Sequence, residues 1–145
     1  MEIKRILAPV DGSDYMKHEI EWACTFAKLF SADLTLLHVV AMPVTSELSG
    51  MPIASKQLEE AGRQILAEAA SLARSCGIEP KIKIDFSVGN PGVRITKIAQ
   101  EESADLIVIG AKGKSRIREL LMGSVANTVV NNASCLVLVV HSCGD

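Results

Sequence analysis

Apolar runs of strand length alternate with stretches of helical periodicity along the whole chain, and this alternation limits the fold more than any other feature. A helix-length segment separates each apolar run from the next, so right-handed crossovers between parallel strands bury both kinds of element. The sequence therefore predicts an α/β fold: a doubly wound, five-stranded parallel sheet in the order 3-2-1-4-5, with helices on both faces. The five predicted strands span residues 3–10, 33–40, 81–88, 105–110 and 135–140.

Residues typical of helix ends mark the first two helices. Ser13 and Asp14 predict the start of the first helix, and apolar residues then recur at helical spacing up to Phe30. The second helix is expected over about residues 55–76. Gly77 is placed to close it in a left-handed conformation, which glycine adopts at little cost.

The third strand and the third helix also carry clear signals. Residues 81–88 alternate polar and apolar side chains, which is typical of a strand with one wet face near a sheet edge. Asn90 and Pro91 predict a helix start, because proline at the first helical position loses no hydrogen bond. The longest predicted loop lacks periodicity and contains Pro43, Gly50 and Pro52.

Length and charge set broad limits on function. The chain has 145 residues, which predicts a single domain over residues 1–145. Its formal net charge of −2 offers no general attraction for nucleic acid. Its apolar runs are too short for a signal peptide or a membrane span, so we expect a cytoplasmic protein without membrane or nucleic-acid partners.

Cysteines and histidines form no pattern that indicates a metal site. None of the four cysteines belongs to a CxxC pair, and they are expected to be small buried residues, except Cys143 near the chain end. His38 falls within the second strand and is expected to be packed and hydrogen-bonded. His18 and His141 are too scattered in the sequence to complete a triad or a metal cluster.

The expected strand order brings two turns together. In doubly wound sheets, ligands bind outside the carboxyl ends of the strands where the winding direction reverses. Asp11-Gly12-Ser13 follows the first strand, and Gly110 opens a longer loop after the fourth. If these strands are neighbours, both loops line one crevice.

The loop from Gly110 to Ser124 has the spacing Gly-x2-Gly-x9-Gly-Ser, completed by Gly113 and Gly123. Glycines let backbone N–H groups approach phosphate oxygens, and a helix beginning near Ser124 would present its positive end to an anion. The Ser124 hydroxyl could cap that helix or bind a phosphate. The alternative is a plain connection whose glycines only make turns. Basic residues that would attract a polyphosphate, or form a solvated surface, are Lys112, Lys114, Arg116 and Arg118.

These motifs resemble the universal stress protein family. The glycine spacing matches the ATP-binding pattern of that family, Gly-x2-Gly-x9-Gly-Ser/Thr, without a gap. The opening residues 4–13 resemble its first strand and turn, residues 36–39 its second strand, and residues 135–140 its last. The resemblance covers essentially the whole chain and implies an adenine-nucleotide-binding stress-response protein.

The resemblance also implies roles for individual residues. Gly110, Lys112 and Gly113 would line the ribose and phosphate path, and Val39 would contact the adenine. Asp11 would lie near the ribose and phosphates, with Mg²⁺ or Mn²⁺ as its partner, or it would serve only as a turn former. Ala126 stands where ATP-binding members commonly carry Ser or Thr, which removes one phosphate hydrogen bond. The implied nucleotide-binding residues are Pro9, Val10, Asp11, Val39, Gly110, Lys112, Gly113, Gly123, Ser124 and Val125.

Three functions remain open on the sequence alone. The first is a regulatory protein in which ATP, or else AMP or ADP, acts as a switch or stabiliser. The second is a slow Mg-dependent ATPase or phosphotransferase that uses Asp11, although no obvious general base adjoins the phosphate site. The third is a nucleotide-free dimeric interaction module. Neither a P-loop nor a dinucleotide-binding Gly-x-Gly-x-x-Gly is present.

The last strand predicts a homodimer. Residues Cys135 to Val140 are apolar on both alternating faces, and the expected order places them at a sheet edge. Pairing with the same strand of a second copy would satisfy the open backbone groups and cover the apolar surface.

Overall fold

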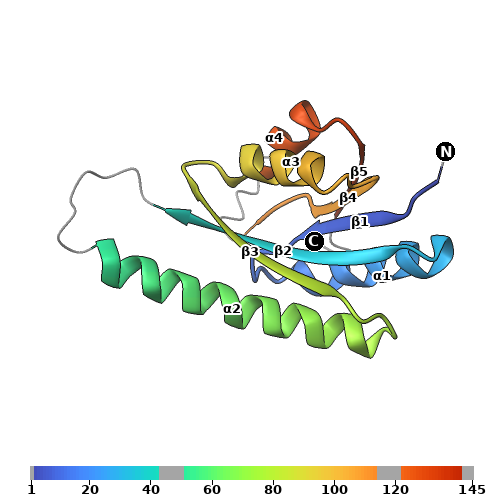
Figure 1. Cartoon of the computed structure of the whole chain (residues 1–145), viewed down its shortest axis with the longest axis horizontal. Helices are drawn as coiled ribbons and strands as arrows, with labels where there is room; N and C mark the ends of the chain where they lie inside the picture. The colour runs from blue at the N-terminus through green and yellow to red at the C-terminus, as the bar shows by residue number, and fades with distance from the viewer. Residues whose placement is uncertain (1, 43–50, 114–121, 142–145) are drawn as a thin grey trace.

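Five parallel strands form one sheet in the order β3-β2-β1-β4-β5 in the computed structural model (Figure 1). The structure describes residues 2–42, 51–113 and 122–141. The predicted sheet and strand order are confirmed. In chain order the elements are β1 (Arg5–Pro9), α1 (Met16–Phe30), β2 (Asp33–Met42), α2 (Met51–Ser75), β3 (Lys81–Val88), α3 (Pro91–Glu101), β4 (Leu106–Gly110), α4 (Ser124–Asn132) and β5 (Leu136–Val140).

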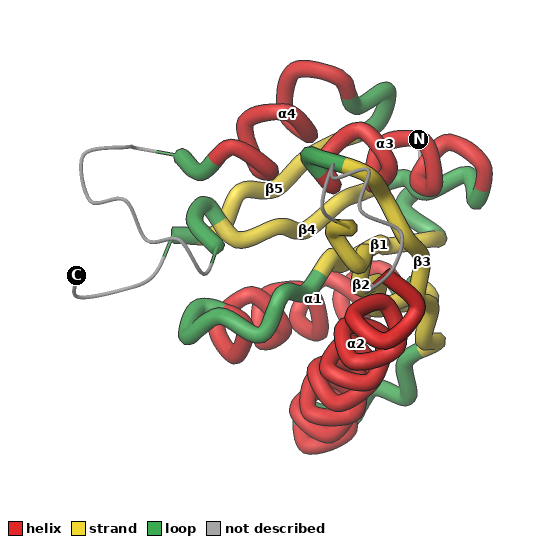
Figure 2. Tube along the Cα trace, turned by 90° about the vertical axis from the view of Figure 1, so that its left-hand side faces the viewer, coloured by secondary structure: helices red, strands yellow, loops and turns green. Residues whose placement is uncertain are grey.

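Two helices cover each face of the sheet (Figures 1 and 2). α1 and α2 pack on one face, and α3 and α4 pack together on the other. The central strand β1 packs against helices on both faces of the sheet. Ile6 and Ala8 belong to the apolar cluster under α1 and α2, and Leu7 belongs to the cluster under α3 and α4. Burial on both faces explains why this strand is a continuous apolar run.

The helix-end signals that depend on short-range geometry are confirmed. Gly77 has a φ of +87° and follows the end of α2. The N–H of Ile78 then donates to the carbonyl oxygen of Ala73 at 3.0 Å, which satisfies a carbonyl at the helix end. Asn90 caps α3, with its Oδ1 accepting from the N–H of Gly92 at 2.7 Å.

The predictions were less accurate at both ends of α1. The helix begins at Met16, not at Ser13 or Asp14, and Tyr15 precedes it without a side-chain cap. Asp11 accepts the N–H of Ser13 in a tight turn, so the chain enters the helix later. At the other end, Phe30 was expected on the buried face and is 42% exposed.

Several other boundaries differ from the prediction. β1 spans Arg5–Pro9 and not residues 3–10, β2 extends to Met42, and β4 begins at Leu106 and not at residue 105. α2 begins at Met51, so Pro52 lies in its first turn, where proline is tolerated, and not in the preceding loop. β5 begins at Leu136, so Cys135 precedes the strand. Of the expected loop, residues 43–50 lie outside the described residues.

Cys24 is buried between α1 and α2 and fits its expected role as a small core residue. Burial, reinforced by the neighbouring Cys76, raises the pKa of its thiol to about 12, so the thiol stays protonated. Cys143 lies outside the described residues. Within the parts of the chain that are described, no helix combines the length and the hydropathy needed to cross a bilayer.

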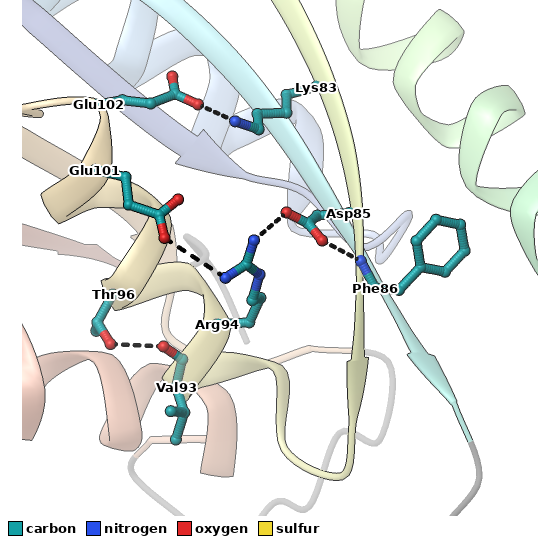
Figure 3. Close-up of polar contacts among 8 residues, drawn as sticks. All are labelled: Lys83, Asp85, Phe86, Val93, Arg94, Thr96, Glu101 and Glu102. Atoms are coloured by element: carbon teal, nitrogen blue, oxygen red, sulfur yellow. Dashed lines mark hydrogen bonds and ion pairs between the residues drawn. The ribbon is translucent and has the colours of Figure 1, made fainter.

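Ion pairs fasten α3 to the edge strand β3 (Figure 3). Arg94 Nη2 lies 2.8 Å from Asp85 Oδ2, and Arg94 Nη1 lies 3.8 Å from Glu101 Oε1. Lys83 Nζ donates to Glu102 Oε2 at 2.6 Å. The hydrogen bond from Arg94 is the main reason that the pKa of Asp85 falls below its usual range.

Replacing Arg94 should therefore weaken the fold in a pH-dependent way. A depressed folded-state pKa means that Asp85 contributes stability above its unfolded pKa of about 3.9, and that this contribution is lost as pH falls through the folded pKa. We expect Arg94→Gln to lower the thermal midpoint by a few degrees at neutral pH. The difference from wild type should shrink as the pH is lowered below about 4.

The matched control is Arg63→Gln, because Arg63 pairs with Glu59 at 3.8 Å on the exposed face of α2. Thermal unfolding followed by circular dichroism should show almost no change for this variant. A difference between Arg94→Gln and wild type that does not vary with pH would show that the Asp85 pair is not its source.

Candidate functional site

A cavity of about 170 Å³ lies at the carboxyl ends of β1, β2 and β4. The first turns of α3 and α4 complete its wall through residues such as Pro91 and Ser124. The structure brings all ten predicted binding residues to this one cavity. They are Pro9, Val10, Asp11, Val39, Gly110, Lys112, Gly113, Gly123, Ser124 and Val125.

The cavity forms here because the winding of the sheet reverses at β1. β1 pairs with β2 on one side and with β4 on the other, and the chain builds outward in both directions. The loops that leave these strands therefore start side by side. The N–H of Val10 donates to Leu37 O at 2.8 Å, and the N–H of Ala111 donates to Val140 O at 2.8 Å, so each loop is held at its base.

Asp11 is held between the two loops. Its Oδ1 accepts the N–H of Ser13 at 3.0 Å, so the turn-forming role considered from the sequence is present. Its Oδ2 faces Gly113 so closely that a Cβ at residue 113 would lie only 2.5 Å from this oxygen. Any larger residue at position 113 would displace the carboxylate of Asp11. Glycine therefore fits here for a steric reason.

Gly123 and Ser124 form the entry to α4. The N–H of Gly123 donates to Ala111 O at 2.6 Å, so the two ends of the glycine loop are tied together. Gly123 is the N-cap residue of α4, and the predicted cap by the Ser124 hydroxyl is wrong because no side-chain cap bond is present. The first turn of α4 thus presents backbone N–H groups beside the cavity, an arrangement that favours anions.

The wall beneath the loops is mainly apolar. Val39, Ile95, Ile109 and Ala126 line it and belong to the apolar cluster under α3 and α4. His38 lines the cavity too, with its Nδ1 2.7 Å from the carbonyl oxygen of Val10. The prediction of a packed, hydrogen-bonded histidine is therefore confirmed.

The basic residues fall into two groups. Lys112 lines the cavity. Lys114, Arg116 and Arg118 lie outside the described residues.

Glu19 is a cavity residue that sequence reasoning missed. It lies on α1 and is 3% exposed, and its Oε2 has no hydrogen-bond partner among the described residues. Burial, and to a lesser degree the charge of Asp11, raises the pKa of Glu19 well above its usual range, against the effect of a hydrogen bond from the Gly110 backbone. The available signal was helical register, since residue 19 falls beside Ile20 and Ala23 on the apolar face.

Asn90 is a second missed contributor, because it joins two helices that wall the cavity. Besides capping α3, its Nδ2 donates to Thr128 Oγ1 on α4 at 3.0 Å. Gly92 packs so closely on Thr128 that a Cβ there would lie 2.7 Å from the threonine Cβ. The cap is recognisable from the sequence, whereas the partner helix α4 is not.

Comparison with known proteins agrees with this geometry. The sequence model of the universal stress protein family matches residues 2–141. The chain belongs to the universal stress protein family. Within this family, universal stress protein MJ0531 of Methanocaldococcus jannaschii is 36% identical over 143 residues, which cover 94% of this chain and 81% of that protein. Universal stress protein YxiE of Bacillus subtilis is 30% identical, with 94% and 98% covered.

Solved universal stress protein structures share the fold. The structure of Methanocaldococcus jannaschii MJ0577 superposes with a TM-score of 0.86 at 26% identity, and both chains are covered in full. A universal stress protein of Archaeoglobus fulgidus in complex with dAMP has a TM-score of 0.71 at 26% identity, with 96% of this chain and 98% of that one covered. Another, in complex with cAMP, has a TM-score of 0.71 at 29% identity, with 95% and 97% covered.

The double role of Asn90 leads to a prediction that separates its cap on α3 from its hydrogen bonds to α4. Asn90→Ala removes both the cap and the bridge and should lower the free energy of unfolding by about 1 kcal/mol or more. Asn90→Asp keeps a good cap acceptor but cannot donate to Thr128, so it should lose only part of that stability.

Chemical denaturation of both variants and of wild type measures these differences. Equal losses in Asn90→Ala and Asn90→Asp would mean that the cap contributes nothing. An unchanged Asn90→Asp would mean that the bridge to α4 contributes nothing.

Proposed function

We propose that this chain is a cytoplasmic stress-response protein that binds an adenine nucleotide, ATP above all, in the cavity at the ends of β1, β2 and β4. The observation that carries the proposal is the convergence of the Asp11 turn and the glycine loop on one cavity beside the start of α4. The relatives solved with dAMP and with cAMP support adenine nucleotides as the ligand class.

The two sides of the cavity suit the two ends of a nucleotide. The apolar wall around Val39 and Ile109 offers surface against which a base can pack. The glycine loop and the first turn of α4 offer backbone N–H groups for phosphates, and Lys112 adds a positive charge. In this arrangement the base lies toward β2 and the phosphates toward α4.

Ala126 limits how tightly the phosphates are held. It is 3% exposed and packs under the cavity, so its methyl group supplies no hydrogen bond where a hydroxyl would. The backbone of the α4 start remains available. Phosphate binding therefore depends on backbone N–H groups more than on side chains.

Binding is favoured over rapid hydrolysis. Among the described residues, the titratable side chains that line the cavity are Asp11, Glu19, His38 and Lys112. Asp11 is engaged in its turn, His38 is engaged with Val10, and Glu19 is buried. None of these groups is poised to activate a water, so we propose that the nucleotide acts as a switch or stabiliser.

The nucleotide site is tested by Gly123→Val. Its backbone φ of −68° and ψ of 165° suit valine, but the added side chain would press on Ala111 O and Lys112 Cα, 3.4 and 3.5 Å from the new Cβ. We expect the rise in thermal midpoint produced by ATP or AMP to be largely lost, corresponding to a loss of affinity of roughly tenfold or more.

The matched control is Asn131→Val, an exposed position near the other end of α4, which should keep the full ligand-induced shift. A thermal shift that survives unchanged in Gly123→Val would reject the proposed phosphate site. The absence of any shift in wild type would reject nucleotide binding itself.

We also propose that two copies pair through β5. This strand ends the sheet next to β4, and Leu136 on it is 54% exposed. An edge strand with apolar side chains offers both unpaired backbone groups and surface to a second copy. A two-fold contact would use the same strand from each copy.

Leu136→Lys should shift the protein from dimer to monomer, because it places a charge in the pairing surface. Analytical ultracentrifugation at several concentrations measures this shift. Val88→Lys is the control, since Val88 is 70% exposed on the opposite edge strand β3. If both variants sediment like wild type, β5 is not the interface.

A further inference from the structure

Two acidic side chains, Asp11 and Glu19, line the cavity beside the glycine loop. Asp11 reaches it from the end of β1, and Glu19 reaches it from α1. They are close enough for the charge of Asp11 to act on Glu19. Glu19 Oε1 also lies near Gly110, 3.6 Å from the position that a Cβ there would occupy. Both acids therefore border the start of the glycine loop.

Glu19 is the unusual member of this pair. Its side chain is 97% buried, and Oε2 lacks a hydrogen-bond partner among the residues that the structure describes. A buried carboxyl oxygen without a partner costs free energy, and such an atom in a native fold commonly indicates a missing water or ion. Within the described part of the chain, neither acid forms an ion pair with a cationic side chain.

The surroundings of the pair suit a small, hard cation. Mg²⁺ and Mn²⁺ prefer oxygen ligands, and Mg²⁺ is usually held by one or two carboxylates together with substrate phosphates. Among the described residues, no group of three or more His, Cys, Asp or Glu converges on a point. Two carboxylates alone hold such an ion weakly, so the phosphates would have to supply the remaining oxygens.

We propose that Asp11 and Glu19 form the protein half of a divalent-cation site that the phosphates of a bound nucleotide complete. This inference rests on the proposed nucleotide-binding function and adds Glu19 to it as a cation ligand. A polyphosphate placed beside two carboxylates meets like charges, and the cation removes that repulsion. Triphosphate binding therefore depends on the cation, whereas binding of a monophosphate that does not reach the pair does not.

Glu19→Gln tests the proposal, because it keeps the shape of the side chain and removes a buried acid. Calorimetric titrations would use ATP with Mg²⁺, ATP with a chelator, and AMP with a chelator. In wild type we expect Mg²⁺ to strengthen ATP binding at least tenfold. In Glu19→Gln that gain should fall to less than threefold, while AMP binding stays within twofold of wild type.

Glu21→Gln is the matched control, since Glu21 lies on the exposed side of the same helix and should keep the full gain. A Glu19→Gln variant with the full Mg²⁺ gain overturns the proposal and shows that a neutral side chain serves equally well. Failure of wild type to bind AMP without metal overturns the nucleotide proposal and this inference with it. A loss of AMP binding in Glu19→Gln alone also overturns the inference, since Glu19 would then act on the nucleotide directly.

Discussion

β1 is hydrogen-bonded in parallel to β2 on one side and to β4 on the other. The helices that follow β1 and β4 cover opposite faces of the sheet, so the space above the carboxyl ends of these two strands stays open. Among the described residues, the Asp11 turn and the two ends of the glycine loop border that space and lie close together. The near contact between Asp11 and residue 113 shows how little room is left, since even a methyl group would collide there. The cavity, the glycines around it and the approach of α4 all depend on this reversal of winding.

The architecture could be predicted because its causes are local or topological. The strands are apolar runs or, in β3, an alternation of polar and apolar residues, and each connection is helical. The handedness of crossovers then leaves few orders for five strands. Gly77 and Asn90 were identified correctly because caps depend on neighbouring residues alone. The start of α1 was predicted too early, because Asp11 and Ser13 form a tight turn of their own before the helix begins at Met16.

Those site residues that directly follow a strand could be predicted from the sequence. The role of Glu19 and the bridge from Asn90 to α4 could not be predicted, because both arise between elements that are distant in sequence. The position of Glu19 depends on how α1 is rotated against the sheet, and Asn90 depends on α4 lying beside α3. An acidic residue on the apolar side of a helix was the one visible sign. The role of this residue can be recognised only once Asp11, which follows β1, is known to lie at the same cavity.

The pairing of strands also orders the assembly of this protein. β1 with β2, and β4 with β5, join segments that are neighbours in the chain, as in Ile6 with Leu34 and Leu106 with Leu136. β1 with β4 instead joins Ile6 to Leu106 across all three intervening crossovers, which contain α1, α2 and α3. Closing so long a loop carries a larger entropic cost, so contacts of this kind form late and slow the folding of parallel sheets. Because the cavity spans this junction, a chain with only its two halves folded has no binding site.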